Sequence, residues 1–216
     1  MKGYTATDAG LKLIPLMLGI VSTSIMSGKL ITKHGHYKRY PIAGTALMAL
    51  GILAMTRLQI DTPYWELSIY AIMVGAGLGL SMQTIVIALQ NAVEFKDMGV
   101  ATSSNTFFRS LGSVFGTAIF GTILTNRLGH YLLGAGFNES DVAKIQSNTA
   151  AIGALPAEGR MTALNAFVDS FHVVFLVAAP IVGIGLLFAL ALRETPLRTN
   201  ADYATARNDA AGEALG

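Results

Sequence analysis

The sequence contains no cysteine, and only 13% of its 216 residues are charged, about half the fraction found in an ordinary soluble domain. The absence of cysteine excludes disulfide frameworks, thiolate zinc sites and cysteine nucleophiles. The 15 Lys and Arg residues are nearly balanced by 13 Asp and Glu, and no basic stripe with interleaved aromatic residues is present, which argues against a nucleic-acid binder. The motifs of zinc proteases, serine hydrolases and phosphate-binding loops are also missing. We therefore predict no catalytic residues, no metal site and no cofactor.

Long uncharged apolar runs dominate what is present. Hydrophobic residues make up 52% of the chain, and residues 67–93 carry no charge at all. A chain of this length cannot surround such a helix on all sides, whereas about 20 apolar residues are what a helix needs to cross a bilayer. We therefore predict an all-α integral membrane protein with five transmembrane helices. The predicted spans are residues 11–31, 40–56, 65–93, 101–124 and 167–192.

The short connections between spans predict their orientation, because basic residues gather on the cytoplasmic side. Residues 28–39 contain four basic residues and no acid, so this connection is expected in the cytoplasm. Alternation then places the N-terminus and an outer loop at residues 125–166 outside the cell. The membrane domain covers residues 1–192, and residues 193–216 are expected to form a disordered cytoplasmic tail. The protein is thus predicted to be a multi-pass protein of the plasma membrane.

The polar N-terminus fits poorly with a free-standing protein. Residues 1–10 contain no apolar segment that could deliver them across the membrane. Because an odd number of spans with an external N-terminus needs such a segment, we expect the chain to be the C-terminal piece of a larger protein.

The connection after the first span combines spaced glycines with basic residues. It resembles the inner-loop signature of major facilitator superfamily transporters, in the form found in their second half. Thr32 stands where the stronger form has Asp, so the charge relay attributed to that Asp is not carried over. The matching residues are Gly28, Lys33, Gly35, Lys38 and Arg39.

A second resemblance is more specific. Residues 88–94 and 99–119 resemble the approach to, and the body of, the penultimate helix of the fourteen-span drug:proton antiporter branch of that superfamily. Residues 3–11 and 194–198 are similar to that branch's entry loop and tail. The resemblance implies the last five spans of such a transporter, alternating access, and export of small hydrophobic molecules coupled to protons. It implies the lipid bilayer, a small-molecule substrate with a proton, and the missing N-terminal half as partners.

Arg109 is the one charge well inside a predicted span. A charged side chain at the bilayer centre costs at least about 2.5–3.5 kcal/mol, so Arg109 is expected to face protein or a water-filled cavity. It could serve a structural or gate-clamping role, or contact the substrate or a proton relay directly. Candidates for its partners and for a polar pathway are Gln83, Gln90, Asn91 and Asn105.

Small residues and two titratable groups complete the candidates. Gly75 with Gly79, and Gly112 with Gly116, have the four-residue spacing that lets membrane helices approach closely. Asp169 and His172 lie three apart near the outer end of the last span, where they could titrate or simply cap the helix start. A metal site would need more ligands.

The residues alone leave another function open. A non-transporting membrane scaffold or assembly partner would use the glycine faces for binding and leave Arg109 merely buried. A facilitator-type transporter of another substrate is a further alternative.

The predicted topology can be tested with reporter fusions. A reporter fused after Arg39 or after Gly216 should be cytoplasmic, and one fused near Ser140 should be external. The measurement is alkaline phosphatase against green fluorescent protein activity at each position. A cytoplasmic reporter at Ser140 in the full-length protein would show that the number of spans is wrong.

Overall fold

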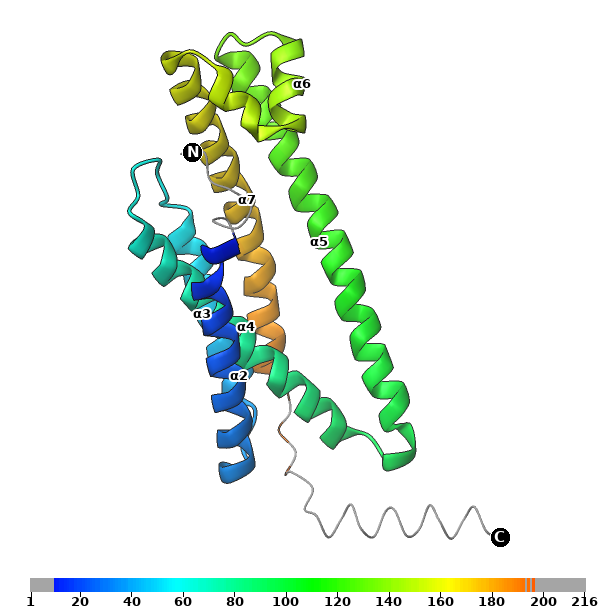
Figure 1. The fold of residues 1–216 in the computed structure, drawn as a ribbon. Helices are drawn as coiled ribbons and strands as arrows, with labels where there is room; N and C mark the ends of the chain where they lie inside the picture. The colour runs from blue at the N-terminus through cyan, green and yellow to red at the C-terminus, as the bar shows by residue number, and fades with distance from the viewer. Residues whose placement is uncertain (1–9, 193, 195, 197–216) are drawn as a thin grey trace, which may run out of the picture.

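The computed structural model describes residues 10–192, Glu194 and Pro196, and all regular structure in that part of the chain is helical (Figure 1). The prediction of an all-α fold is confirmed. Each long helix overlaps one predicted span, whereas the predicted tail lies outside the described residues except at Glu194 and Pro196. The elements are α2 (Ile14–His34), α3 (Arg39–Met55), α4 (Tyr64–Ala92), η1 (Phe95–Asp97), α5 (Met98–Gly134), α6 (Glu139–Ser147), η2 (Thr149–Ala154) and α7 (Ala157–Ala191).

Helix length separates α3 from the other long helices. α2, α4 and α7 are each long and apolar enough to cross a membrane, as is the stretch of η1 and α5. α3 is apolar but has only 17 residues, at the lower limit of what spans a bilayer. Four candidate spans are therefore present among the described residues, and a fifth crossing by α3 stays a prediction.

The turn between α2 and α3 is built from local signals in the sequence. α2 carries a proline in its first turn and ends at Gly35, whose φ of 74° is left-handed, a conformation that glycine adopts without steric cost. The Gly35 N–H donates to the Ile31 carbonyl at 2.8 Å. Lys33 lies in the last turn of α2, where its charge opposes the negative end of the helix dipole. The chain then reverses and α3 begins at Arg39.

Glycines bring α4 into backbone contact with α2. A Cβ atom placed on Gly75 would meet the Leu16 carbonyl oxygen, and one on Gly79 would meet the Ile20 carbonyl oxygen. From the other side, a Cβ on Gly19 would lie 2.7 Å from the Ile72 carbonyl oxygen. Neither helix can therefore accept a larger residue at this crossing without moving apart.

The opposite face of α4 packs in the same manner against α3. A Cβ on Gly44 would lie 2.6 Å from the Gly77 carbonyl oxygen and 2.5 Å from the Ser81 hydroxyl, and one on Gly77 would meet the Gly44 carbonyl oxygen. A Cβ on Gly51 would lie 2.8 Å from the Val74 side chain. α4 is thus the central helix of a three-helix unit, the α2–α4 unit, and α7 packs on the α3 side of it.

Close approach also creates hydrogen bonds between helices. The Thr23 hydroxyl donates to the Ala76 carbonyl at 3.0 Å, and the Ser24 hydroxyl donates to the Gly79 carbonyl at 3.1 Å. Such bonds between membrane helices are worth about 0.6 kcal/mol on average. They add to the packing rather than replace it.

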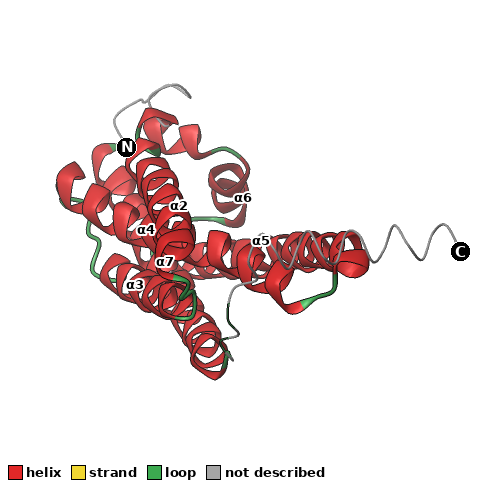
Figure 2. Cartoon of the chain, turned by 90° about the horizontal axis from the view of Figure 1, so that it is seen from below, coloured by secondary structure: helices red, strands yellow, loops and turns green. Residues whose placement is uncertain are grey.

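α5 leaves the bundle for most of its length. Viewed along the bundle, it extends to one side of the other long helices (Figure 2), and no residue between positions 98 and 127 is buried. A Cβ on Gly112 would have no neighbour within 4 Å, and one on Gly116 would meet only Phe120 of the same helix, at 3.9 Å. Within the described chain the predicted Gly112–Gly116 face therefore contacts no other helix, and its role in packing stays a prediction.

The connection at residues 125–166, expected as a loop, is largely helical. α5 continues to Gly134, α7 begins at Ala157, and α6 and η2 lie between them. Together they form a helical cap around a small apolar core. The core residues are Leu128, Leu132, Val142, Ile145, Ile152, Ala163, Ala166 and Phe167. Charged residues at 127 and 160 mark the ends of the apolar runs, but they do not end the helices, because Arg favours helix and can face outward.

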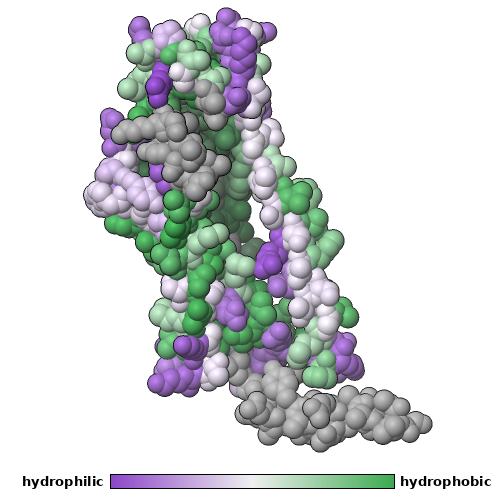
Figure 3. Space-filling model, in the orientation of Figure 1, coloured by the Kyte–Doolittle hydropathy of each residue, from purple (hydrophilic) through white to green (hydrophobic). Residues whose placement is uncertain are grey.

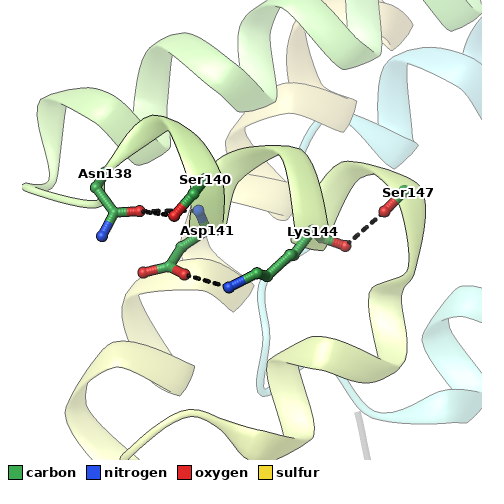
Figure 4. A network of polar contacts seen from close by, with 5 residues as sticks. All are labelled: Asn138, Ser140, Asp141, Lys144 and Ser147. Atoms are coloured by element: carbon green, nitrogen blue, oxygen red, sulfur yellow. Dashed lines mark hydrogen bonds and ion pairs between the residues drawn. The ribbon is translucent and has the colours of Figure 1, made fainter.

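Side-chain contacts fix the start of α6 within this cap (Figure 4). The Asn138 Oδ1 accepts hydrogen bonds from the Asp141 N–H at 2.9 Å and from the Ser140 hydroxyl at 2.8 Å, which is an ordinary helix N-cap. The Lys144 Nζ lies 3.4 Å from the Asp141 carboxylate. The Gln146 side chain donates to the Thr125 carbonyl at 2.9 Å and so ties α6 to α5.

The glycine contact between α2 and α4 predicts a clear difference between two alanine variants. Gly75→Ala should lower the melting temperature of the protein in detergent, because its methyl group overlaps the Leu16 carbonyl and overpacking costs about 1–3 kcal/mol. Gly185→Ala on α7 is the matched control, since nothing lies within 4 Å of a Cβ there and alanine favours helix by up to about 1 kcal/mol. Equal melting temperatures for the two variants would contradict the close crossing.

Candidate functional site

The predicted pathway residues lie on α4 and α5 but do not gather in one place. Gln83 and Arg109 are exposed, while Gln90 and Asn105 are half-buried. No hydrogen bond or ion pair joins these four side chains in the part of the chain that the structure describes. Gln83 lies near the α2–α3 end of the bundle, with its Cγ 3.8 Å from where a Cβ on Gly28 would stand.

Arg109 lies on the part of α5 that stands away from the other helices. α5 begins at Met98, so Arg109 is about 17 Å along the helix at 1.5 Å per residue. Phe107, Phe108 and Phe115 on the same stretch are each at least 59% exposed. The guanidinium has no partner among the described residues. An apolar helix carrying an exposed Arg needs a covering surface that offers acceptors at this depth.

The surface of the molecule is arranged as a membrane requires. Hydrophilic side chains gather at its two ends, and hydrophobic surface covers the helices between them (Figure 3). The same view shows a hydrophilic patch between the bundle and α5, below the middle of the molecule but away from its lower end. Polar groups at this level are functional candidates, because polar residues inside a membrane are costly and mark pathways or partners.

Asn91 makes a contact that the sequence did not predict, and its place beside a pathway stays a prediction. It is buried, and its Nδ2 donates to the Pro196 carbonyl at 3.0 Å. The end of α4 is thereby joined to the segment after α7. The sequence offers no signal for this pairing, because the two residues are 105 positions apart.

The inner-loop signature forms a second contact with the segment after α7. The Glu194 carboxylate accepts hydrogen bonds from the Tyr37 N–H at 2.9 Å and from the Lys38 N–H at 3.4 Å. His36 Nδ1 lies 3.3 Å from the same oxygen. Tyr37 itself is buried between the helices, at 2% exposure. We call Glu194, His36, Tyr37 and Lys38 the turn network.

The turn network explains the acidity of Glu194. Partial desolvation raises the pKa of its carboxyl, but the hydrogen bonds from the Lys38 and Tyr37 N–H groups and the nearby His36 outweigh this and hold the pKa below its ordinary value. Of the signature residues, Lys33 and Arg39 are exposed. Their side chains remain available to solvent or to lipid headgroups.

Asp169 and His172 lie near the middle of α7, beside the connection between α3 and α4. They do not cap the helix start, because α7 begins at Ala157, twelve residues before Asp169. His172 is half-buried and its Nε2 lies 2.5 Å from the Leu58 carbonyl, so this nitrogen carries the proton and donates it. Asp169 is exposed. Together with Asp61 and Gln59, which sequence reasoning missed, both line one cavity. No group of three or more potential metal ligands is present among the described residues.

Comparison with known proteins matches one family over nearly the whole chain, and the similar proteins are named as transporters. The sequence model of a family described as Major Facilitator Superfamily matches residues 2–212. An uncharacterized MFS-type transporter of Mycobacterium tuberculosis is 38% identical over 210 residues, which cover 97% of this chain and 31% of that protein. The multidrug transporter protein MdtP of Bacillus subtilis is 36% identical over 130 residues, covering 60% of this chain and 24% of that protein.

A third relative has a more specific name. The tetracycline resistance determinant of Streptomyces rimosus is 34% identical over 124 residues, which cover 57% of this chain and 36% of that protein. The chain thus spans about a third of the length of these relatives, or less. No solved structure matches.

The turn network predicts that Glu194 stabilises the fold in a pH-dependent manner. Glu194→Ala should lower the melting temperature at neutral pH, because it leaves the Tyr37 N–H without its acceptor. The folded-state pKa is lowered, so this stabilisation is fully present above the ordinary glutamate pKa and is lost as the pH falls through the lowered value. The difference in melting temperature between wild type and variant should therefore shrink in acid. Glu158→Ala removes an exposed carboxylate from the first turn of α7, where only the helix dipole favours it, and should lower the melting temperature less at neutral pH.

Proposed function

The chain belongs to the Major Facilitator Superfamily, and we propose that it forms part of a secondary active transporter that exports drugs or other small hydrophobic molecules in exchange for protons. The family match carries the transporter assignment. Relatives named for multidrug transport and tetracycline resistance support export of such molecules. Coupling to protons rests on the resemblance of residues 99–119 to the drug:proton antiporter branch. Because the matched residues cover only 24% and 36% of these two relatives, the activity is proposed for the whole protein.

The helices of this chain fit a transporter that works by alternating access, in which one rigid body rocks against another. The α2–α4 unit is held by backbone contact at glycine, so we expect it to move as one piece. α5 carries its polar residues on a stretch that no other described helix covers. Alternating access requires a rigid body that rocks against another across a polar pathway. We propose that α5 faces this pathway, with Arg109 at its middle.

Arg109 is proposed as a clamp whose partner belongs to another part of the transporter. Five fixed donors suit it to hold an acidic or carbonyl partner across the pathway. We place Gln83, Gln90 and Asn105 beside the same pathway. The plasma membrane, with the turn network on the cytoplasmic side, is the proposed location.

Transport by Arg109 variants of the full-length protein tests this proposal. Arg109→Ala should lower proton-driven export into proteoliposomes roughly tenfold or more, which corresponds to about 1.4 kcal/mol. Arg109→Lys should retain part of the activity, since it keeps the charge and loses the forked geometry. Substrate binding should fall less than turnover.

The matched control is Arg127→Ala, an exposed arginine on the same helix beyond the uncovered stretch. It should transport normally. Normal export by Arg109→Ala at normal abundance would remove the clamp. Export by the wild type without any response to a proton gradient would leave a transporter of another coupling type, and no export at all would favour the scaffold alternative.

A further inference from the structure

Two adjoining cavities lie between the connection from α3 to α4 and one side of α7. Their volumes are about 440 Å³ and 430 Å³. They share Gln59 and Ile60 from the connection and Val168 and His172 from α7. We call the pair the α7 chamber. Its volume is within the range of pockets that hold drug-sized molecules, about 300–1,000 Å³.

The first compartment of the chamber is apolar and aromatic. Phe167, Phe171 and Phe175 line it from α7, together with Leu67 at the start of α4. Phe171 and Phe175 stack with ring centroids 6.1 Å apart. Phe171 is 40% exposed, so its ring is open to an incoming molecule. Aromatic faces attract cations as well as apolar groups.

The second compartment carries negative charge at the mouth. Asp61 lines it from the connection and Asp169 from α7, and neither forms an ion pair among the described residues. Among the residues that the structure describes, no Lys or Arg lines either compartment. His172 stands between them and donates to the Leu58 carbonyl, which holds the connection against α7 and keeps the chamber in shape.

We propose that the α7 chamber binds an amphipathic organic cation, with the apolar body against the phenylalanine rings and the positive charge toward Asp61 and Asp169. Charge complementarity selects the sign of the ligand, because two carboxylates repel an anion and attract a cation. The size and the aromatic lining select a bulky apolar body. This site is separate from the pathway proposed at Arg109. The binding proposal rests on the shape and lining of the cavity, and it does not require the proposed transport activity.

Protection of a single introduced cysteine tests the site at residue level. The chain has no cysteine of its own, so Gln59→Cys in the full-length protein gives a unique label within this chain at the chamber. The protein is placed in nanodiscs of phosphatidylglycerol and labelled with an impermeant maleimide, and the peptide containing residue 59 is followed by mass spectrometry. Tetraphenylphosphonium is the cationic probe, and tetraphenylborate is the anion of the same size and shape.

The expected result is that tetraphenylphosphonium slows labelling of Gln59→Cys several-fold, whereas tetraphenylborate does not. Ser140→Cys in the helical cap should be labelled at the same rate with and without either probe. Adding Asp61→Asn and Asp169→Asn should raise the concentration needed for protection about tenfold, since each exposed carboxylate contributes up to about 1 kcal/mol. Glu158→Gln, an exposed carboxylate of α7 outside the chamber, should leave it unchanged.

A cavity-filling variant tests whether the cation needs the open cavity as well as the two carboxylates. Val168→Trp, combined with Gln59→Cys, should remove protection by the cation. The proposal is overturned if both probes protect equally, if the Asp61 and Asp169 variants leave protection unchanged, or if the cation protects nothing. It is also overturned if labelling is already slow without probe and tetraphenylphosphonium does not change it, because lipid then fills the chamber.

Discussion

Where α4 crosses α2 and α3, the carbonyl oxygens of one helix stand where a side chain on the other would have to be. Lipid chains are as apolar as leucine, so helices in a membrane gain little from burying apolar surface and associate through close packing. Backbone contact at glycine supplies this packing, and it lets Thr23 and Ser24 reach carbonyl groups of α4. The relative position of the three helices, and hence of both connections between them, follows from that contact.

The same physical requirement explains why glycine spacing identifies a face that can be packed closely but does not identify the helix that packs on it. Gly75 with Gly79 and Gly112 with Gly116 share one spacing, yet α2 lies against the first pair and no described helix lies against the second. Spacing shows that a helix can be approached closely; it does not say by what. The partner depends on tertiary arrangement, and for α5 it is not among the described residues of this chain.

Apolar runs predicted α2, α3 and α4 to within three residues, because a bilayer imposes both length and composition, but α5 extends ten residues past its predicted end and α7 begins ten residues before its predicted start. The same reasoning missed the helical cap, because α5 and α7 continue past the charged residues that bound their apolar runs. Leu128 and Leu132 continue the apolar stripe of α5 past Arg127 at four-residue spacing and are buried in the cap. The turn network could not be predicted from the sequence for a different reason. Glu194 and Tyr37 lie 157 positions apart, and no local sequence pattern links them.

These contacts together divide the chain into two parts: α7 is attached to the α2–α4 unit, whereas most of α5 is not. α7 is attached to the α2–α4 unit beyond its C-terminal end, where the Glu194 carboxylate accepts from the Tyr37 N–H, and near its middle, where His172 donates to the Leu58 carbonyl. α5 meets α7 in the helical cap, where Leu128 and Leu132 are buried. At its other end η1 joins α5 to α4, and these two helices are also in direct contact. Motion of α5 against α7 and the α2–α4 unit is therefore least restricted between these two attachments, and that stretch contains Arg109.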